Sequence, residues 1–142
     1  MSKLRLVLML MMTAAAIVTL PNVSTAQPSA SGGGCQDAGG TGMDSCVAAY
    51  GSSMPLTLIG NFGINNFSNT VYDGWAHYFM CFAGGGCNYH FYVQTNYTGS
   101  YPLMFDQTGM GAGSARSEFD LYDTDVYTYY ATRVSPWQDW VP

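Results

Sequence analysis

The chain has 142 residues and a net charge of −5, with nine acidic and four basic side chains. This balance argues against nucleic acid as a partner, because binding to phosphates depends on clustered lysine and arginine. The length is that of one domain. Aromatic residues make up 15% of the chain, so rings are the side chains most available for recognition.

The first 26 residues have the pattern of a secretory signal peptide. Lys3 and Arg5 precede an apolar run from residue 6 to residue 18, and small residues at 24–26 provide a cleavage site. The apolar run is shorter than the roughly 20 residues that a membrane-spanning helix needs. Cleavage after Ala26 would leave two arginines against nine acidic residues, a net charge of −7. We therefore predict a secreted protein, extracellular or periplasmic.

Residues 27–50 are rich in glycine and serine and show no hydrophobic periodicity. They are predicted to form a flexible lead-in to a β-domain of residues 51–142. Within the lead-in, residues 44–50 fit either a short helix capped by Asp44 or Ser45, or an irregular loop. At most one short N-terminal helix is therefore expected.

Four cysteines lie beyond the signal, and an even number of cysteines in an exported domain predicts disulfides. Three pairings are possible. Proximity in the sequence favours Cys35–Cys46, which would tie down the lead-in, and Cys81–Cys87, which would close a turn.

From Pro55 onward, apolar and polar residues alternate with the period of β-strands, and connectors rich in glycine and asparagine separate the runs. No segment is long enough for a helical crossover, so the strands should be antiparallel. The last eight residues contain two prolines and are not expected to form a central strand. We predict an all-β fold, a small disulfide-stabilised antiparallel β-sandwich or barrel of about six short strands, at 55–62, 71–82, 87–97, 101–105, 119–122 and 126–134.

Residues 71–97 are predicted to form a β-hairpin around an Ala-Gly-Gly-Gly turn. Its two histidines and two cysteines also suggest zinc, but His77 and His90 point to opposite faces if Cys81 faces Cys87, so a disulfide is preferred. In this register the core face carries Trp75, His77, Phe79, Cys81, Cys87, Tyr89, Phe91 and Val93. The opposite face carries the predicted binding residues Tyr78, His90, Tyr92 and Gln94.

Acidic residues near the C-terminal hairpin are the candidate metal site. Their carboxylates suit calcium, the one cofactor that the sequence suggests, although the glycine and the distal glutamate of an EF-hand loop are missing. Two carboxylates two residues apart on one strand are too close for glycoside hydrolysis, and Ser114 lacks the Gly-x-Ser-x-Gly frame of a hydrolase nucleophile. The candidate calcium ligands are Glu118, Asp120, Asp123 and Asp125.

Three classes of function remain open. The favoured class is a secreted, non-catalytic domain that binds a carbohydrate or protein surface, because rings stack on apolar faces and amides satisfy hydroxyl groups. Trp137 and Trp140 are further candidates for this surface. The second class is a membrane-acting or self-assembling protein, since tryptophan and tyrosine seat well at a lipid interface. The third is a small secreted hydrolase.

Overall fold

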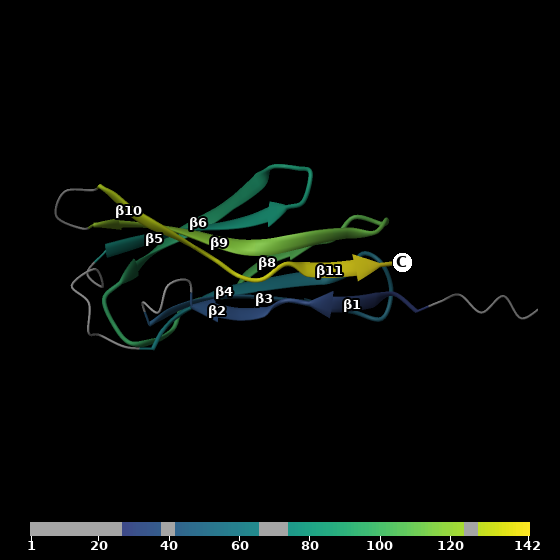
Figure 1. Cartoon of the computed structure of the whole chain (residues 1–142), viewed down its shortest axis with the longest axis horizontal. Coiled ribbons are helices and arrows are strands. Elements are labelled where there is room, and N and C mark those ends of the chain that lie inside the picture. Colours follow the sequence, from purple (N-terminus) through teal and green to yellow (C-terminus); the bar gives the residue numbers. More distant parts are fainter. Residues whose placement is uncertain (1–26, 38–41, 66–73, 124–127) are drawn as a thin grey trace, which may run out of the picture.

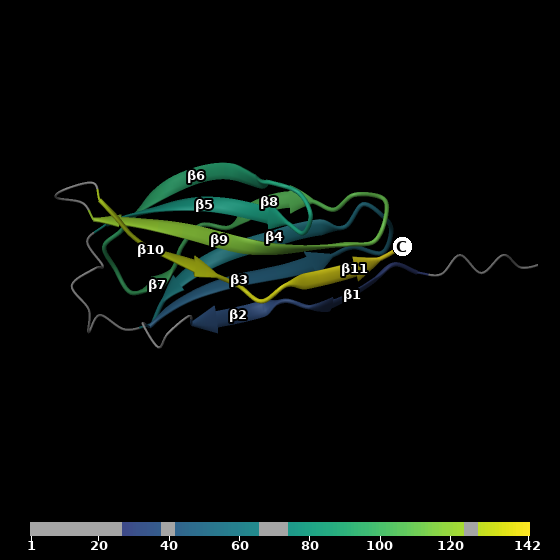
Figure 2. The same ribbon diagram turned by 45° about the horizontal axis from the view of Figure 1, so that its top comes forward.

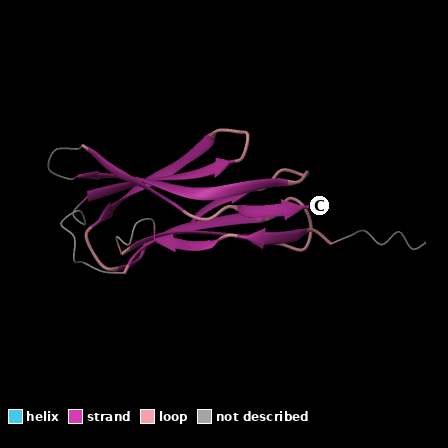
Figure 3. Cartoon of the chain, viewed as in Figure 1, coloured by secondary structure: helices cyan, strands magenta, loops and turns pink. Residues whose placement is uncertain are grey.

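The computed structural model describes residues 27–37, 42–65, 74–123 and 128–142, so the predicted signal peptide lies outside the described residues. The described residues form eleven β-strands and no helix (Figure 1, Figure 3). All strand pairs are antiparallel, and the two sheets lie one on top of the other. The predicted all-β, sandwich-like class is thereby confirmed. None of the described segments is a helix of the length and apolar character that a membrane span requires.

The larger sheet has six strands and is centred on one long strand. Its order is β1 (Ser29–Gly32), β11 (Gln138–Val141), β9 (Gly113–Asp123), β5 (Gly74–Phe82) and β6 (Cys87–Thr95), with β10 (Tyr129–Val134) also paired to β9. Strand β5 lines one side of β9, and β10 and β11 follow each other along the other side (Figure 2). Strands β9 and β10 pair with each other, where the sequence predicts strands at 119–122 and 126–134.

The smaller sheet has five strands. Its order is β2 (Gly34–Asp37), β3 (Met43–Tyr50), β4 (Thr57–Ile64) and β7 (Gly99–Ser100), with β8 (Met104–Gln107) also paired to β4. Strand β4 alternates buried and half-buried residues along its whole length, as a strand with one face on the core must.

The core fills the space between the two sheets. Leu58 and Phe62 of β4 meet Tyr78 of β5 and Phe119 of β9, and all four side chains are fully buried. The ring centroids of Phe62 and Phe119 lie 5.1 Å apart, so aromatic packing connects the sheets directly. Burial of each such side chain contributes about 1.5–3 kcal/mol to the free energy of unfolding.

The sheets approach closely where Gly60 of β4 faces Ser117 of β9. A Cβ atom on Gly60 would overlap Met104 Cε and would lie 3.0 Å from Ser117 Cβ. The space at this position is therefore already occupied by Met104, from the neighbouring strand β8, and by Ser117 of the opposite sheet. Glycine at residue 60 is required by packing rather than by a turn.

The glycine- and serine-rich segment before residue 51 belongs to the two sheets, which corrects the prediction of a flexible lead-in. The short helix and the loop considered for residues 44–50 are both wrong, because these residues form β3. Met43, Ser45 and Val47 are buried at alternate positions, a strand pattern that the small residues between them conceal in the sequence. Gly32, Gly33 and Gly34 have φ values of 76°, 70° and 94°, and this left-handed stretch leads the chain from one sheet to the other.

The C-terminal segment also differs from expectation. Strand β11 lies between β1 and β9 and is therefore a central strand. Pro136 and Pro142 flank the four residues of β11, so neither proline interrupts its hydrogen-bond ladder. The described residues thus hold eleven strands rather than about six, and β9, with 11 residues, is longer than the strand predicted at 119–122.

Both predicted disulfides are present, and each joins directly paired residues of neighbouring strands. Cys35–Cys46 connects β2 to β3, and Cys81–Cys87 connects the ends of β5 and β6 across their turn. Two such bonds are consistent with an oxidising, extracellular environment.

Candidate functional site: an aromatic face on the six-stranded sheet

The register of β5 and β6 changes halfway along the hairpin. Near the turn, Cys81 faces Cys87 and Phe79 faces Tyr89, as predicted. Beyond a β-bulge, His77 faces Tyr92 rather than Phe91. The bulge places two residues of β6, at 90 and 91, opposite the single residue Tyr78.

The two faces of β5 are the reverse of those predicted. Tyr78, expected on the exposed binding face, has 0% of its surface exposed and packs between Phe91 and Phe119, with ring centroids 4.4 and 4.3 Å away. This burial raises the pKa of the Tyr78 hydroxyl above its ordinary value. Trp75, His77 and Phe79, expected in the core, lie on the outside of the sheet and are only half-buried.

The outer side of this sheet carries a continuous group of rings, which we call the aromatic face. Strands β5, β6, β9 and β10 all contribute to it, because residues paired across neighbouring strands point to the same side. Its members are Trp75, His77, Phe79, Tyr89, Tyr92, Tyr122 and Tyr129.

His77 is at the centre of the aromatic face. Its ring centroid lies 4.6 Å from that of Tyr122, 5.8 Å from Tyr92 and 5.9 Å from Tyr89. Trp75 extends the group, because its ring meets Tyr92 edge-on at 5.1 Å. The rings therefore support one another across three strands and hold a defined surface.

Three tyrosines of the aromatic face are exposed. Tyr92 has 58% of its surface accessible, and Tyr89 and Tyr129 are similarly open. Contiguous exposed apolar surface on a soluble domain usually marks a place of interaction. The outer side of the six-stranded sheet is therefore the candidate binding surface.

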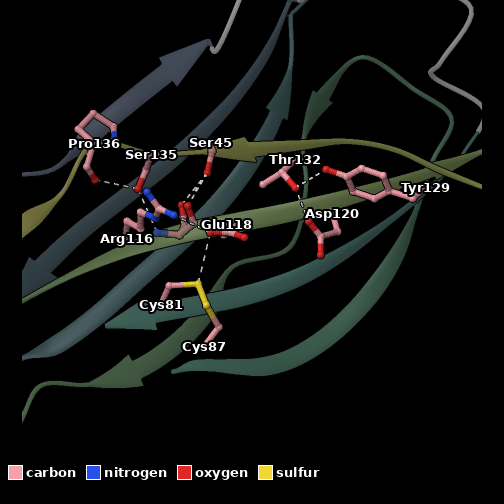
Figure 4. A network of polar contacts seen from close by, with 11 residues as sticks. Ser45, Cys81, Cys87, Arg116, Glu118, Asp120, Tyr129, Thr132, Ser135 and Pro136 are labelled. Carbon is pink, nitrogen blue, oxygen red and sulfur yellow. Dashed lines mark hydrogen bonds and ion pairs between the residues drawn. A yellow bond between two sulfur atoms is a disulfide. The ribbon is translucent and has the colours of Figure 1, made fainter. Parts of the chain in front are cut away.

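Polar groups border the rings and are themselves held in place. The Thr132 hydroxyl donates to Asp120 Oδ1 at 2.6 Å, so the Tyr129 hydroxyl, 2.7 Å from Thr132 Oγ1, is the donor of that second bond (Figure 4). Gln94 is exposed and pairs across the strands with Trp75, as expected for a residue on this side. Tyr129, Thr132 and Asp120 thus provide fixed polar groups beside the rings, and Gln94 adds an exposed amide.

A second polar group lies at the disulfide end of the same surface. Arg116 Nη2 donates to Glu118 Oε2 at 3.1 Å, and the guanidinium carbon lies 4.9 Å from the centre of the Trp137 ring. Glu118 Oε2 is also 3.5 Å from Cys81 Sγ, which is a contact only, because a disulfide sulfur carries no proton to donate (Figure 4). Trp137, a predicted binding residue, is exposed here.

Metal ligands are grouped closely at one place in the described residues. Cys81, Cys87 and Glu118 have donor atoms within 4.8 Å of one another, but the two sulfurs are bonded together and cannot act as thiolates. Of the predicted calcium ligands, Glu118 accepts a hydrogen bond from Arg116, and Asp120 accepts one from Thr132. Asp125 and the side chain of Asp123 lie outside the described residues, so calcium stays a prediction.

Two further predicted binding residues lie away from the aromatic face. Trp140 is buried between the sheets, where its Nε1 donates to Gly111 O at 2.9 Å. His90 is displaced toward the other sheet, and its Nε2 lies 3.3 Å from Asp106 Oδ2 of β8. Asn88 Nδ2 donates to the same carboxylate at 2.9 Å, so this cluster connects the edges of the two sheets.

Sequence reasoning missed most of the aromatic face. Only Tyr92 and Gln94 were placed on the correct side. The clearest sequence signal for the outer side of the sheet lies in β9. There the polar or amphipathic residues Glu118, Asp120 and Tyr122 alternate with the buried residues Ser117, Phe119 and Leu121. Residues paired with Glu118, Asp120 and Tyr122 must point to the same side of the sheet. Pairing β9 with β5 would therefore have placed Trp75, His77 and Phe79 outside.

The outer side of the five-stranded sheet holds a shallow hollow of about 340 Å³. The Cys35–Cys46 disulfide forms part of it, together with Tyr50, Ile59 and Leu103. No charged residue lines it. This hollow lies on the opposite side of the sandwich from the aromatic face.

The aromatic face combines flat apolar rings with hydrogen-bonded carboxylate and hydroxyl groups and an exposed amide. Such a surface holds ligands that have both an apolar face and hydrogen-bonding groups. Comparison of the chain with protein-family models, with curated proteins and with solved structures gives no match.

Proposed function

We propose that the chain is a secreted, non-catalytic module that binds carbohydrate on the aromatic face. The observation that supports this most directly is the group of rings around His77 with exposed tyrosines at 89, 92 and 129. A sugar ring has an apolar C–H face that stacks on an aromatic ring, and its hydroxyls require partners at the rim. Gln94, Asp120 and Tyr129 supply such partners next to the rings.

The arrangement favours binding over hydrolysis. Glycoside hydrolysis needs two carboxyl groups on either side of the scissile bond, about 5 Å apart or more. Glu118 and Asp120 instead lie side by side on the outer face of one strand, and each is already bonded within the protein. They are therefore suited to accepting hydrogen bonds from a ligand that rests on the sheet.

Secretion is supported by two independent features. The two disulfides suit an oxidising compartment. The first 26 residues, outside the described part of the chain, have the composition of a signal peptide.

The test is a pair of matched tyrosine variants screened on a glycan array and then titrated by calorimetry. Tyr92→Ala removes a ring that is 58% exposed on the aromatic face, and Tyr50→Ala removes one that is 60% exposed on the opposite sheet. We expect Tyr92→Ala to weaken glycan binding about tenfold or more, the equivalent of 1.4 kcal/mol, and Tyr50→Ala to leave it unchanged. An array without any bound glycan, or equal losses in the two variants, would contradict the proposal.

A further inference from the structure

We infer that the aromatic face selects uncharged or amino-bearing glycans and rejects acidic ones. This inference rests on the proposed carbohydrate binding and adds the charge class of the ligand. It follows from the position of two carboxylates beside the rings and from the positions of the two arginines.

The carboxylates of Glu118 and Asp120 border the rings along β9. Asp120 is directly opposite His77 across the strands, and Glu118 is directly opposite Phe79. Side chains at directly paired positions have Cβ atoms about 4.5–5.5 Å apart and point to the same side. A glycan that covers the rings of β5 therefore comes within a few ångströms of two carboxylates and of the Arg116 guanidinium that is paired with Glu118, a group with one net negative charge.

No cation among the described residues is directed at the rings. The four basic residues of the chain are Lys3 and Arg5, in the predicted signal peptide, and Arg116 and Arg133. Arg116 is paired with Glu118 at 3.1 Å and stacks on Trp137. Arg133 is 7% exposed, and its Nη1 donates to the carbonyl of Thr132 at 3.0 Å.

Carboxylates discriminate between ligands by what they can accept. Asp120 has about four acceptor positions, of which the Thr132 hydroxyl takes one, so a sugar hydroxyl or ammonium group has acceptors available. A uronate or sulfate offers only acceptors and a second negative charge, and this repulsive element excludes it. The surface thus combines attraction for neutral and amino sugars with repulsion of acidic sugars.

The test compares glycans that differ only in charge. The full chain is applied, at pH 8 and low salt, to an array of neutral, amino and uronic acid oligosaccharides, because histidine side chains are usually neutral at that pH. The affinity for the strongest neutral ligand is then compared, by titration, with the affinity for the same oligosaccharide after its primary alcohol groups have been oxidised to carboxylates. We expect the neutral form to bind about threefold or more tightly than the carboxylated form, with a smaller ratio at high salt.

Two isosteric variants separate local charge from the charge of the whole molecule. Asp120→Asn removes one negative charge beside the rings, and Asp44→Asn removes one from β3 on the opposite sheet. We expect Asp120→Asn to reduce the preference for the neutral form and Asp44→Asn to leave it unchanged. Equal effects of the two variants would overturn the inference.

The outcomes also separate this inference from the proposed function. Acidic oligosaccharides that bind as well as neutral ones would overturn the charge selection and leave carbohydrate binding intact. An array without any bound glycan would overturn both.

Discussion

Ser45 of β3 and Ser117 of β9 form a hydrogen bond between their hydroxyls, at 2.7 Å, in the middle of the sandwich. Ser117 Oγ donates to Cys46 O at 2.7 Å, so Ser45 is the donor to Ser117. The Ser117 amide in turn donates to Ser135 Oγ at 3.0 Å. This network satisfies polar groups that the packing of the two sheets removes from water.

Truncation of Ser117 should destabilise the fold more than truncation of Ser45. Ser117→Ala removes the hydroxyl donor from the Cys46 carbonyl and leaves the Ser45 hydroxyl only its longer bond to the Ser117 carbonyl, at 3.2 Å, so we expect a cost of about 1–3 kcal/mol. Ser45→Ala removes the donor itself and should cost about 1 kcal/mol. Urea unfolding gives both values, with exposed Ser53→Ala as the control. A larger loss of stability for Ser45→Ala than for Ser117→Ala would show that the hydrogen bonds of the network do not run in the described directions.

Removal of the Tyr78 hydroxyl should not destabilise the protein. This hydroxyl is fully buried and has no hydrogen-bond partner among the described residues. Tyr78→Phe keeps the ring contacts with Phe91 and Phe119 and is expected to be neutral or stabilising by up to about 1 kcal/mol. Tyr101→Phe is the contrasting variant. The Tyr101 hydroxyl donates to Tyr97 O at 2.8 Å, so its removal should destabilise the protein. A clear destabilisation by Tyr78→Phe would refute this prediction.

The stability of the protein should fall as the pH rises above about 10. Burial raises the pKa of the Tyr78 and Tyr101 hydroxyls in the folded state above the ordinary value of 10. The unfolded chain therefore releases these protons first, and each tyrosine lowers the free energy of unfolding by up to about 1.4 kcal/mol per pH unit. Below pH 10 the contribution is fully present.

This dependence is measured as the urea midpoint at pH 8, 10 and 11. Tyr78→Phe removes one of the two buried hydroxyls and should make the decline less steep. An unchanged decline in that variant would assign the effect to other groups.

A methyl group at residue 60 should destabilise the sandwich. Gly60→Ala places a Cβ against Met104 and within 3.0 Å of Ser117 Cβ. Met104 can shift its side chain, but Ser117 is fixed in β9, so we expect a cost of about 1–3 kcal/mol. Gly63→Ala on the same strand is the matched control, because the nearest atom to its Cβ is 3.9 Å away. Thermal unfolding that fails to distinguish the two variants would disprove tight packing at Gly60.

Local spacing was sufficient to predict the class of fold and both disulfides. Each pair of cysteines is separated by a short segment, and in both cases the two strands pair at those residues. The period of two in Leu58, Gly60 and Phe62 likewise predicted β4 and its inner side. These features depend on residues that are close in the sequence, which is why the sequence alone reveals them.

The candidate site depended on information that local spacing does not contain. Ala76, Tyr78 and Met80 are as apolar as Trp75, His77 and Phe79, so alternation defines two faces of β5 without showing which is inside. The five-stranded sheet decides this by covering Tyr78. The bulge at residues 90–91 was equally hidden, because neither residue is a glycine that would mark it.

That bulge also sets the tolerance of the aromatic face to changes in chain length. Tyr89 and Tyr92 are three residues apart yet point to the same side, which a regular strand does not allow. Deletion of residue 90 or 91 would remove the bulge and bring Tyr89 and Tyr92 to a spacing of two. The two tyrosines would therefore still point to the same side of the sheet. An added residue would instead leave three residues of β6 opposite Tyr78 and enlarge the irregularity in the ladder. This surface therefore withstands loss of a residue at this point better than gain.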